Sequence, residues 1–511
     1  MKQRFYVTTP IYYVNGAPHI GHAYTSIATD VLARWKRLDG YDVLFLTGTD
    51  EHGQKVEQAA RDAGVDPQSF TDRISADFQD MTQAMGVSND QWIRTTEQRH
   101  KRSCAALWQR IEAAGDIYLG HYEGWYAVRD EAFYDENELT THPDGLKTAP
   151  TGAPVEWVRE PSYFFRLSNW QERLLKFYDE HPDFIAPLSR RNEVISFVRG
   201  GLHDLSISRT SFTWGVPVPG APNHVMYVWL DALTNYITAC GFPAEDQPEW
   251  AFWPADVHVV GKDIIRFHAV YWPAFLMSAG LPPPRRVSSH GWWVVEGEKM
   301  SKSLGNVVEP RQLVATYGLD QIRYFLLREK PFGADGSMSH QAIVTRINGE
   351  LANDLGNLAQ RSLTLIARNC GAVLPARGAA TEADKALLAA VQALPELIRV
   401  AMDQQTFHEA LEAIWKVIRA ANAYIDHQAP WVLARTDLPR MGTVLRTLAD
   451  LLRAVATLLQ PFLPGSMARL LDQLGVPSEA RTIAALNTPL PDGVPLPAPQ
   501  GIFPRYVEPE S

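Results

Sequence analysis

The N-terminal segment contains a strand, a helix and a second strand in an order that restricts what the chain can fold into. Residues 4–9 and 42–47 are rich in apolar residues, as is typical of buried strands. The helical pattern between them starts near His22 and ends at Gly40. Its apolar face consists of Ile27, Val31, Trp35 and Leu38. A strand–helix–strand unit of this kind is parallel and right-handed, so the sequence predicts an α/β fold built on a parallel sheet.

Two histidines stand at the start of this helix, in the string His19-Ile20-Gly21-His22. The amides and the dipole of a helix N-terminus favour anions, and imidazoles add donors that strengthen as negative charge develops. The order strand, turn and helix with two imidazoles therefore predicts a phosphate site. Alone, such a pair is more often a helix cap plus a surface histidine, or a metal pair.

A second string, Lys299-Met300-Ser301-Lys302-Ser303, carries two ammonium groups on a stretch flanked by Gly297 and Gly305. Lysine is a compact charge with three donors, and we expect this loop to close over a triphosphate. Two lysines among serines are usually only a solvated loop. Both strings occurring in this order by chance is far rarer than either alone. Together they predict a site that activates a carboxylate with ATP.

Composition narrows the class of protein without identifying it. The 511 residues are enough for two to four domains. The net charge of −10 gives no global basic field, although a local basic face would suffice for RNA. The N-terminus does not resemble a signal peptide, and no apolar stretch is long enough to suggest a membrane span. The cysteines are isolated and form no disulfide framework, so we expect a cytoplasmic protein; they are Cys104, Cys240 and Cys370.

The pattern along the chain changes several times. A helical stretch is followed, from about residue 117, by short β-like runs. Strand-like segments return at Val225–Trp229 and Val257–Val260. From about residue 346 the pattern is helical and predicts a bundle. We expect the proline-rich tail to fold back on the body through Ile502, Phe503 and Tyr506.

Several strings resemble the methionyl-tRNA synthetases, a family of class I aminoacyl-tRNA synthetases. They are Thr9–Gly16 running into His19–His22, Thr47–Gly53, Tyr227–Leu233, Gly261–Ile264 and Lys299–Ser303. The strings are long, keep the family's order and extend over essentially the whole chain. The resemblance implies an α/β, Rossmann-like parallel-sheet catalytic domain with an inserted connective domain, followed by an all-α anticodon-binding bundle.

The resemblance and the changes of pattern together predict how the chain is divided. The expected regions are a first catalytic half at 1–116, a connective insertion at 117–224, a second catalytic half at 225–290, a lysine-loop and stem-contact region at 291–345, and a helical anticodon-binding domain with the C-terminal tail at 346–511.

The resemblance implies a two-step reaction. The carboxylate of methionine attacks the α-phosphorus of ATP, and the 3′-terminal ribose of initiator or elongator tRNA(Met) then accepts the methionyl group. By analogy, His19 and His22 contact the phosphates, while Lys299 and Lys302 stabilise the pentacoordinate phosphate and the departing pyrophosphate. Further implied ATP contacts are Gly21, where a side chain would clash with adenine or ribose, Asp263 at the ribose, and Ser303. Mg²⁺ is expected to accompany ATP, held largely by its phosphates.

The amino-acid pocket follows from the same resemblance. A thioether is soft and flexible, so aromatic walls with sulfur contacts suit it. Asp50 matches the acid that pairs with the α-ammonium group. The other residues that match the family's pocket are Ile11, Tyr13, Trp229, Leu233, Tyr236, His268 and Trp272. Without the resemblance the aromatic members would be interpreted as core, because the chain contains 15 tryptophans.

In the helical region, Asn357, Arg361 and Trp431 match the positions at which the family binds the CAU anticodon. Anticodon bases are single-stranded, so stacking on an indole and hydrogen bonds from an amide and a guanidinium are suitable chemistry. Alone, Asn357 and Arg361 would be a surface pair one turn apart on a helix.

The sequence departs from part of the family in two respects. Many relatives carry a zinc knuckle in the insertion, but here no cysteine lies between Cys104 and Cys240. A site made of cysteine ligands is therefore impossible there, and we predict no structural zinc. The appended C-terminal dimerisation module of some relatives is also missing, so we expect a monomer.

Three alternatives remain open at this point. Synthetases for leucine, valine, isoleucine or cysteine share both signature strings, although the first three have editing domains that make them much longer. Small nucleotidyltransferases of the His-x-Gly-His type are about a third of this length and lack the helical bundle. A tRNA-binding paralogue without catalysis is disfavoured because both histidines and both lysines are present.

Overall fold

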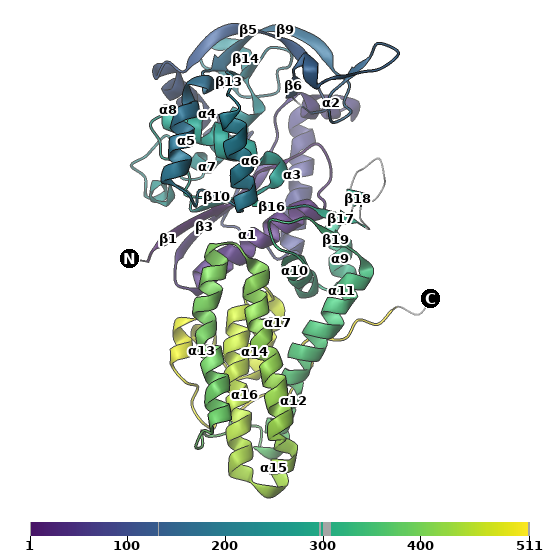
Figure 1. The fold of residues 1–511 in the computed structure, drawn as a ribbon, viewed down its shortest axis with the longest axis vertical. Helices are drawn as coiled ribbons and strands as arrows, with labels where there is room; N and C mark the ends of the chain where they lie inside the picture. The colour runs from purple at the N-terminus through teal and green to yellow at the C-terminus, as the bar shows by residue number, and fades with distance from the viewer. Residues whose placement is uncertain (1, 131, 296–297, 300–307, 509–511) are drawn as a thin grey trace.

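The computed structural model of the chain describes residues 2–130, 132–295, 298–299 and 308–508. It contains a parallel-sheet α/β part, a β-rich part inserted into it, and a long all-α bundle that follows both (Figure 1). This arrangement confirms the predicted fold class.

In the described residues, the main sheet has seven strands in the order β10-β16-β15-β1-β3-β2, with β4 also paired to β3, and every pairing is parallel. The strands are β1 (Arg4–Thr8), β2 (Tyr12–Tyr13), β3 (Asp42–Asp50), β4 (Gln91–Arg94), β10 (Ile185–Ala186), β15 (Val257–Gly261) and β16 (Val287–His290). Helix α1 (Ile20–Leu38) connects to β3 and is buried along most of its length. The predicted strand–helix–strand unit is therefore confirmed.

Further helices surround this sheet. They are α2 (Gln54–Asp62), α3 (Pro67–Ala84), α4 (Gln98–Ala113), α5 (Gln171–Glu180), α6 (Leu188–Arg199), α7 (Val228–Thr238), the π-helical turn η5 (Phe267–Tyr271) and α8 (Trp272–Ser278). Beyond the sheet, α9 (Pro310–Tyr317) and α10 (Leu319–Arg328) lead toward the bundle.

The inserted part is built around a long antiparallel ribbon of β5 (Ile117–Ala127) and β9 (Glu156–Phe165), at the top of Figure 1. The smaller strands near it are β6 (Ala132–Tyr134), β7 (Thr140–Thr141), β8 (Lys147–Thr148), β11 (Leu205–Ser206), β12 (Ser208–Arg209), β13 (Pro217–Val218) and β14 (Ala221–Met226). Strand β10 lies within the range predicted for the insertion, yet it pairs with β16 at the edge of the main sheet. A two-residue strand has no periodicity that a sequence could reveal. The domain boundaries stay a prediction.

A few small side chains and hydrogen bonds hold the far end of the ribbon. The buried cluster there consists of Ala127, Ala149 and Ala153. Next to it, the Asp130 carboxylate accepts hydrogen bonds from the hydroxyls of Tyr134, at 2.9 Å, and Thr151. Alanine packing and hydrogen bonds to Asp130 therefore stabilise this end of the ribbon.

One strand prediction is wrong in part. The segment Val225–Trp229 was expected to be extended, but β14 ends at Met226 and Trp229 lies in the first turn of α7. β-branched and aromatic residues favour strands when considered alone. In the fold, however, α7 buries Leu230 and Leu233 in the core beneath the sheet, so tertiary packing decides in favour of the helix.

The bundle begins with a long rod in which α11 (His340–Arg346), the π-helical segment η7 (Ile347–Gly356) and α12 (Asn357–Asn369) follow without a break. The other bundle helices are α13 (Glu382–Asp403), α14 (Phe407–Gln428), α15 (Pro430–Thr436), α16 (Leu438–Leu459) and α17 (Pro464–Gln473). Helix α16 is buried from Val444 onward except at Asp450 and forms the centre of the bundle. The predicted fold-back of the tail is confirmed, since Ile502 and Phe503 are buried and Tyr506 contacts Tyr317.

Within the described part of the chain, none of the helices is long and apolar enough to cross a membrane.

A fully buried ion pair joins the sheet to the bundle. The guanidinium of Arg323, on α10, lies 2.7 Å from the carboxylate of Asp30, on α1, and both side chains are 0% exposed. Three other N–H groups of Arg323 donate to the backbone carbonyls of Met85, Pro461 and Phe462. One side chain therefore ties α1, the end of α3 and the turn before α17 together.

Charge balance keeps Asp30 ionised in this position. Burial alone would raise the pKa of its carboxyl group, but Arg323 and the partly exposed Arg34 together hold that pKa below its usual value. The backbone N–H and the hydroxyl of Ser88 also donate to it, at 2.7 and 2.6 Å. Removing one arginine would leave a buried negative charge only partly compensated.

We expect Arg323→Met to destabilise the protein by about 3–5 kcal/mol, because it strands the Asp30 carboxylate in the interior. The midpoint of urea unfolding measures this loss. The matched variant Arg34→Met removes a partner that is 30% exposed and should cost about 1 kcal/mol or less. Because the native pKa of Asp30 is lowered, the difference between wild type and Arg323→Met should narrow as the pH falls below 3.8. Equal losses in the two variants would contradict this account.

Candidate active site

His19 and His22 close the N-terminus of α1 by hydrogen-bonding to its backbone. The N–H of Gly21 donates to Nδ1 of His19, and the N–H of His19 donates to Nδ1 of His22, both at 3.1 Å. This reciprocal arrangement is a capping box in which imidazoles replace the usual hydroxyl and carboxylate. Because each Nδ1 accepts a hydrogen bond, the proton of each neutral ring sits on Nε2. The ring centroids are 3.8 Å apart, so two N–H donors stand side by side at a helix N-terminus.

Gly21 is constrained by its neighbour before any ligand is considered. A Cβ atom at this position would come within 2.9 Å of Cε1 of His19. A side chain would therefore displace the capping imidazole. The clash with a nucleotide that the sequence analysis expected stays a prediction.

Three of the predicted residues, His19, Asp50 and Asp263, lie at one edge of the main sheet. Asp50 is the last residue of β3, and Asp263 follows the end of β15 in the turn Lys262–Ile264. The carboxyl ends of parallel strands share one edge, where α/β proteins bind their ligands. His19 lies at the same edge because it caps the N-terminus of α1, the helix that follows β2 in the chain.

Asp263 has a neighbour that the sequence analysis did not name. Its carboxylate accepts a hydrogen bond from the indole N–H of Trp292 at 3.2 Å. The ammonium group of Lys262 lies 4.1 Å from the centre of the same indole and pairs with Asp335 at 2.6 Å. Asp263 itself is exposed, so a ligand can reach its carboxylate.

The second signature string is described only at its start. In a small sheet, β17 (Trp293–Val295) pairs with β18 (Glu298–Lys299) and with β19 (Gly336–Met338), and Lys299 is the register partner of Val294. Lys302 and Ser303 lie outside the described residues, as does the loop that carries them.

Five of the predicted methionine-binding residues gather in one aromatic cluster. Helix α7 supplies three of them, η5 supplies one, and α8 begins with the fifth; they are Trp229, Leu233, Tyr236, His268 and Trp272. The Tyr236 ring lies 5.7 Å from that of His268 and 6.0 Å from that of Trp272. Trp229 is partly exposed and meets His268 edge-on at 6.2 Å, whereas the other four are buried.

The hydrogen bonds in this cluster fix uncharged forms of its polar side chains. His268 places Nδ1 3.0 Å from the carbonyl of Ile264, so Nδ1 carries the proton and Nε2 accepts from the Tyr236 hydroxyl at 2.7 Å. Burial lowers the pKa of His268 to about 4 and raises that of Tyr236 far above its usual value. The cluster is therefore neutral near pH 7, which suits an uncharged thioether.

The remaining members of the predicted methionine set approach from the sheet. Ile11 packs against the same core cluster as Tyr236. Tyr13 of β2 is the register partner of Asp50 in β3, and Asp50 is buried. After burial, the negative charge of Asp50 contributes to the raised pKa of Tyr236.

Two aromatic neighbours were missed by the sequence analysis. Phe267 stacks on Trp229 with ring centroids 3.7 Å apart and planes only 8° from parallel. His258 stacks on Tyr236 at 4.0 Å and accepts from the indole N–H of Trp272. Both residues lie within six positions of the string Gly261–Ile264, which was the only sequence signal available for them.

The predicted anticodon residues lie together at the far end of the bundle. Asn357 begins α12 and is exposed, with Arg361 one turn later. The Arg361 guanidinium lies 5.2 Å from the centre of the Trp431 indole and pairs with Asp426 at 2.6 Å. Trp431 is 42% exposed on α15, at the end of the molecule opposite the ribbon (Figure 1).

A backbone turn places Trp431 on this surface. Ala429 adopts φ +45° and ψ 59°, a left-handed conformation between the end of α14 and the start of α15. Pro430 then opens the new helix at a position that suits its missing N–H. The chain reverses here, and the indole faces outward beside Arg361.

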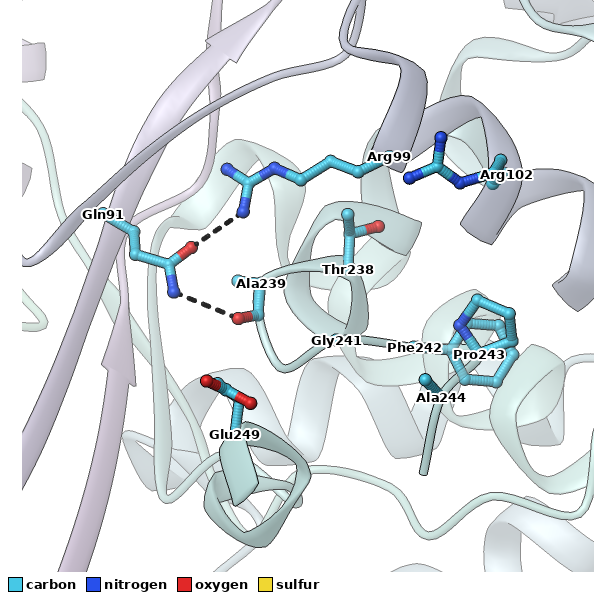
Figure 2. Close-up of a pocket in the computed structure, with 10 residues that line it drawn as sticks. All are labelled: Gln91, Arg99, Arg102, Thr238, Ala239, Gly241, Phe242, Pro243, Ala244 and Glu249. Atoms are coloured by element: carbon cyan, nitrogen blue, oxygen red, sulfur yellow. Dashed lines mark hydrogen bonds between the residues drawn. The ribbon is translucent and has the colours of Figure 1, made fainter. Parts of the chain in front are cut away.

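A pocket of about 460 Å³ lies at the other end of α7 from Trp229 (Figure 2). The Gln91 side chain crosses one side of it, accepting from Arg99 and donating to the carbonyl of Ala239, both at 3.1 Å. None of the predicted site residues lines this pocket. It is therefore separate from the aromatic cluster.

Two family models match the chain, one over each of its main parts. The family model described as class I tRNA synthetases (M) matches residues 5–363, and that of the anticodon-binding domain of methionyl tRNA ligase matches residues 374–510. The chain is 59% identical to the methionine–tRNA ligase of Mesorhizobium japonicum over 99% of this chain and 98% of that protein. Identity to the methionine–tRNA ligase of Rhizobium meliloti is 57%, over 99% of each chain.

Solved structures agree with these relatives. The methionyl-tRNA synthetase of Mycobacterium tuberculosis in complex with methionyl-adenylate superposes with a TM-score of 0.96 and 55% identity, covering 98% of this chain and 100% of that one. The apo form from the same organism gives a TM-score of 0.91 and 51% identity, covering 100% and 99%.

Proposed function

The chain belongs to the methionyl-tRNA synthetase family, and we propose which of its residues carry out each step of the reaction. It is a methionine–tRNA ligase, which activates methionine with ATP to methionyl-adenylate, releases pyrophosphate and transfers methionine to the 3′ end of tRNA. The observation that carries the assignment is the match over both the catalytic and the anticodon-binding parts, at 59% identity along 99% of the chain.

Adenylate formation needs placement and charge stabilisation more than proton transfer. The attacking carboxylate is already an anion, so no general base is required. The Nε2–H groups of His19 and His22 donate to the phosphates of ATP, at a helix end that already favours anions. Lys299 and Lys302 stabilise the pentacoordinate phosphate and the leaving pyrophosphate, with Ser303 beside them.

The nucleoside end of ATP binds at the neighbouring strand ends. The Asp263 carboxylate accepts hydrogen bonds from the ribose hydroxyls. In doing so, the hydroxyls replace the Trp292 indole N–H that donates to this carboxylate in the present structure. Gly21 leaves room for adenine or ribose beside His19. Mg²⁺ enters with ATP and is held mainly by the phosphates, which fits a first turn of α1 without any acidic residue.

Methionine binds between Asp50 and the aromatic cluster. Asp50 pairs with the α-ammonium group, and the side chain lies against Tyr13, Ile11 and the five residues of the cluster. The neutrality of Tyr236 and His268 supports this placement, because a charged group there would have to be desolvated by an apolar ligand.

The CAU anticodon of initiator and elongator tRNA(Met) binds at Asn357, Arg361 and Trp431. One base stacks on the indole, while the amide and the guanidinium donate to base edges. The half-exposed indole and the partly exposed guanidinium above it support this role. Asp426 holds Arg361 in place until a base replaces it.

Several finer properties belong to the same proposal. We expect no structural zinc in the insertion, because no cysteine lies between Cys104 and Cys240; the alanines and Asp130 at the end of the ribbon support this expectation. A monomeric state and a cytoplasmic location stay predictions.

Pyrophosphate exchange with each of the twenty amino acids tests the function directly. Methionine-dependent exchange should exceed exchange with leucine or isoleucine by about 100-fold or more, given the discrimination that a shaped apolar pocket provides. Exchange with leucine or cysteine alone would refute the assignment, and exchange with no amino acid would favour a tRNA-binding paralogue.

The substitution His19→Asn separates capping from catalysis. Asparagine is a good helix cap, so the unfolding midpoint should stay near that of the wild type, whereas the imidazole donor is lost. We expect the kcat of pyrophosphate exchange to fall about 100-fold or more. His19→Ala serves as the comparison, since it should lose the activity and also about 1 kcal/mol of stability. Full exchange activity in His19→Asn would exclude His19 from the phosphate site.

Trp431→Ala should lower kcat/KM for tRNA charging by about 10–100-fold, because stacking contributes about 1–3 kcal/mol per base. Pyrophosphate exchange should be nearly unchanged, since α15 is far from the sheet. Val432→Ala is the matched control, as Val432 is the next residue and is 51% exposed. Equal loss of exchange and charging would contradict the proposed separation of the two sites.

A further inference from the structure

A buried carboxylate between two histidines connects three elements beneath the aromatic cluster. Asp231 of α7 accepts from Nδ1 of His52 at 2.6 Å and from Nε2 of His100 at 2.7 Å. All three side chains are almost completely buried. His100 belongs to α4, whereas His52 lies in the loop that leaves β3. These three residues have no role in the mechanism proposed above.

The two histidines lead to different parts of the molecule. His52 follows Asp50 by two residues, on the segment that carries the proposed ammonium anchor. His100 is on the outer helix α4, near Thr238 at the end of α7, and α4 supplies none of the proposed ligand contacts. Asp231 is therefore bonded on one side to the amino-acid site and on the other to a supporting helix.

Helix α7 carries the other half of the amino-acid site. Trp229, Leu233 and Tyr236 repeat at helical spacing and face the aromatic cluster, while Asp231 points to the opposite side, toward α4. The hydrogen bond between His52 and Asp231 thus joins the segment that anchors the ammonium group directly to the helix that receives the side chain.

The segment around His52 is held firmly on its other sides. The buried Glu51 carboxylate receives both arms of the Arg94 guanidinium, at 2.6 and 3.0 Å. The Trp214 indole N–H donates to the carbonyl of Glu51 at 2.6 Å, and its ring packs edge-on against His52 at 5.5 Å. Because the segment is held in this way, the position of the His52 side chain fixes the position of Asp50, two residues earlier in the chain.

The charge of Asp231 strengthens its hydrogen bonds with His52 and His100. Burial would raise the pKa of Asp231, but His52 and His100 outweigh burial and hold the pKa well below its usual value, so the carboxylate is ionised. Hydrogen bonds to an ionised group are shorter and stronger than those between neutral groups. An aspartate in this setting holds both donors at fixed distances.

A metal ion would explain the cluster less well. Cys104 lies 3.2 Å from Nε2 of His100 and 3.8 Å from Oδ1 of Asp231, so three possible ligand atoms converge there. Ligands of tetrahedral zinc are about 3.3–3.7 Å apart, given zinc–ligand distances of about 2.0–2.3 Å. The 2.7 Å between His100 and Asp231 is that of a hydrogen bond instead.

We propose that Asp231 is a positioning residue for methionine recognition, acting through His52 to set the distance between the Asp50 carboxylate and the aromatic cluster. This inference rests on the proposed function. A fixed distance between ammonium anchor and side-chain pocket selects substrates by length. It therefore bears on the discrimination between methionine and homocysteine, which is shorter by one methyl group.

The test compares the two histidines that share one carboxylate. His52→Ala should raise KM for methionine in pyrophosphate exchange about tenfold, the scale of one hydrogen bond to a charged group, with KM for ATP unchanged. His52→Asn keeps a donor near the position of Nδ1 and should restore KM for methionine to within about threefold of wild type. His100→Ala removes the other donor and should lower the unfolding midpoint while leaving KM for methionine near that of wild type.

Substrate length supplies a second measurement. In His52→Ala the ratio of kcat/KM for methionine to that for homocysteine should fall, because the distance from anchor to pocket is no longer fixed. In His100→Ala and in Cys104→Ser the ratio should stay at the wild-type value. These variants alter the same buried cluster without touching the link to Asp50.

Several results would overturn the proposal. An unchanged KM for methionine in folded His52→Ala would do so, as would an equal rise in His100→Ala. Stoichiometric zinc in the purified wild-type protein would assign the cluster to a metal instead. If the wild-type protein exchanges pyrophosphate with no amino acid, the proposed function itself is refuted. If the wild type activates methionine but the variants behave otherwise than expected, only the role of Asp231 is refuted.

Discussion

The buried ion pair between Asp30 and Arg323 determines how the catalytic sheet and the helical bundle are placed relative to each other. Asp30 lies in the middle of α1, eleven residues after His19 and thus about 16 Å along the helix. The same helix ends with Lys36 and Asp39, which pair with Asp403 and Arg399 of the bundle. One helix therefore presents the imidazoles at its start and contacts the bundle along the rest of its length. The sheet and the bundle cannot move relative to each other here without breaking a buried charge pair.

Charge is distributed in accordance with the ligand expected at each place. The helix end at His19 and His22 and the lysine string carry donors and positive charge for a triphosphate, and the far end of the bundle offers a guanidinium beside an indole for bases. Between them, burial keeps Tyr236 and His268 neutral for a thioether. Where no ligand is expected, the buried charge of Asp30 is compensated by a protein group, the guanidinium of Arg323.

Helix α14 illustrates how packing carries position over the length of the bundle. At its start Phe407 packs edge-on against Phe332, and Phe332 in turn contacts Tyr24 of α1 at 5.6 Å. At its end Asp426 holds Arg361 beside Trp431. The surface at which we propose the anticodon binds and the helix that carries the imidazoles are therefore linked through α14, by side-chain contacts at its two ends.

Local sequence patterns were enough to predict the elements whose periodicity is strong, namely the strand–helix–strand unit around α1 and the long helices of the bundle, and the motifs were enough to predict the family. Local patterns failed at β10, which has only two residues, and at Trp229, where local strand preference yielded to burial of a helix. Motifs also named most members of the aromatic cluster. Only the tertiary structure could bring His52 to Asp231, because a hydrogen bond between residues 179 positions apart leaves no local pattern. The tautomers of His19 and His268 likewise depend on which backbone groups face each nitrogen, and the fold alone decides that.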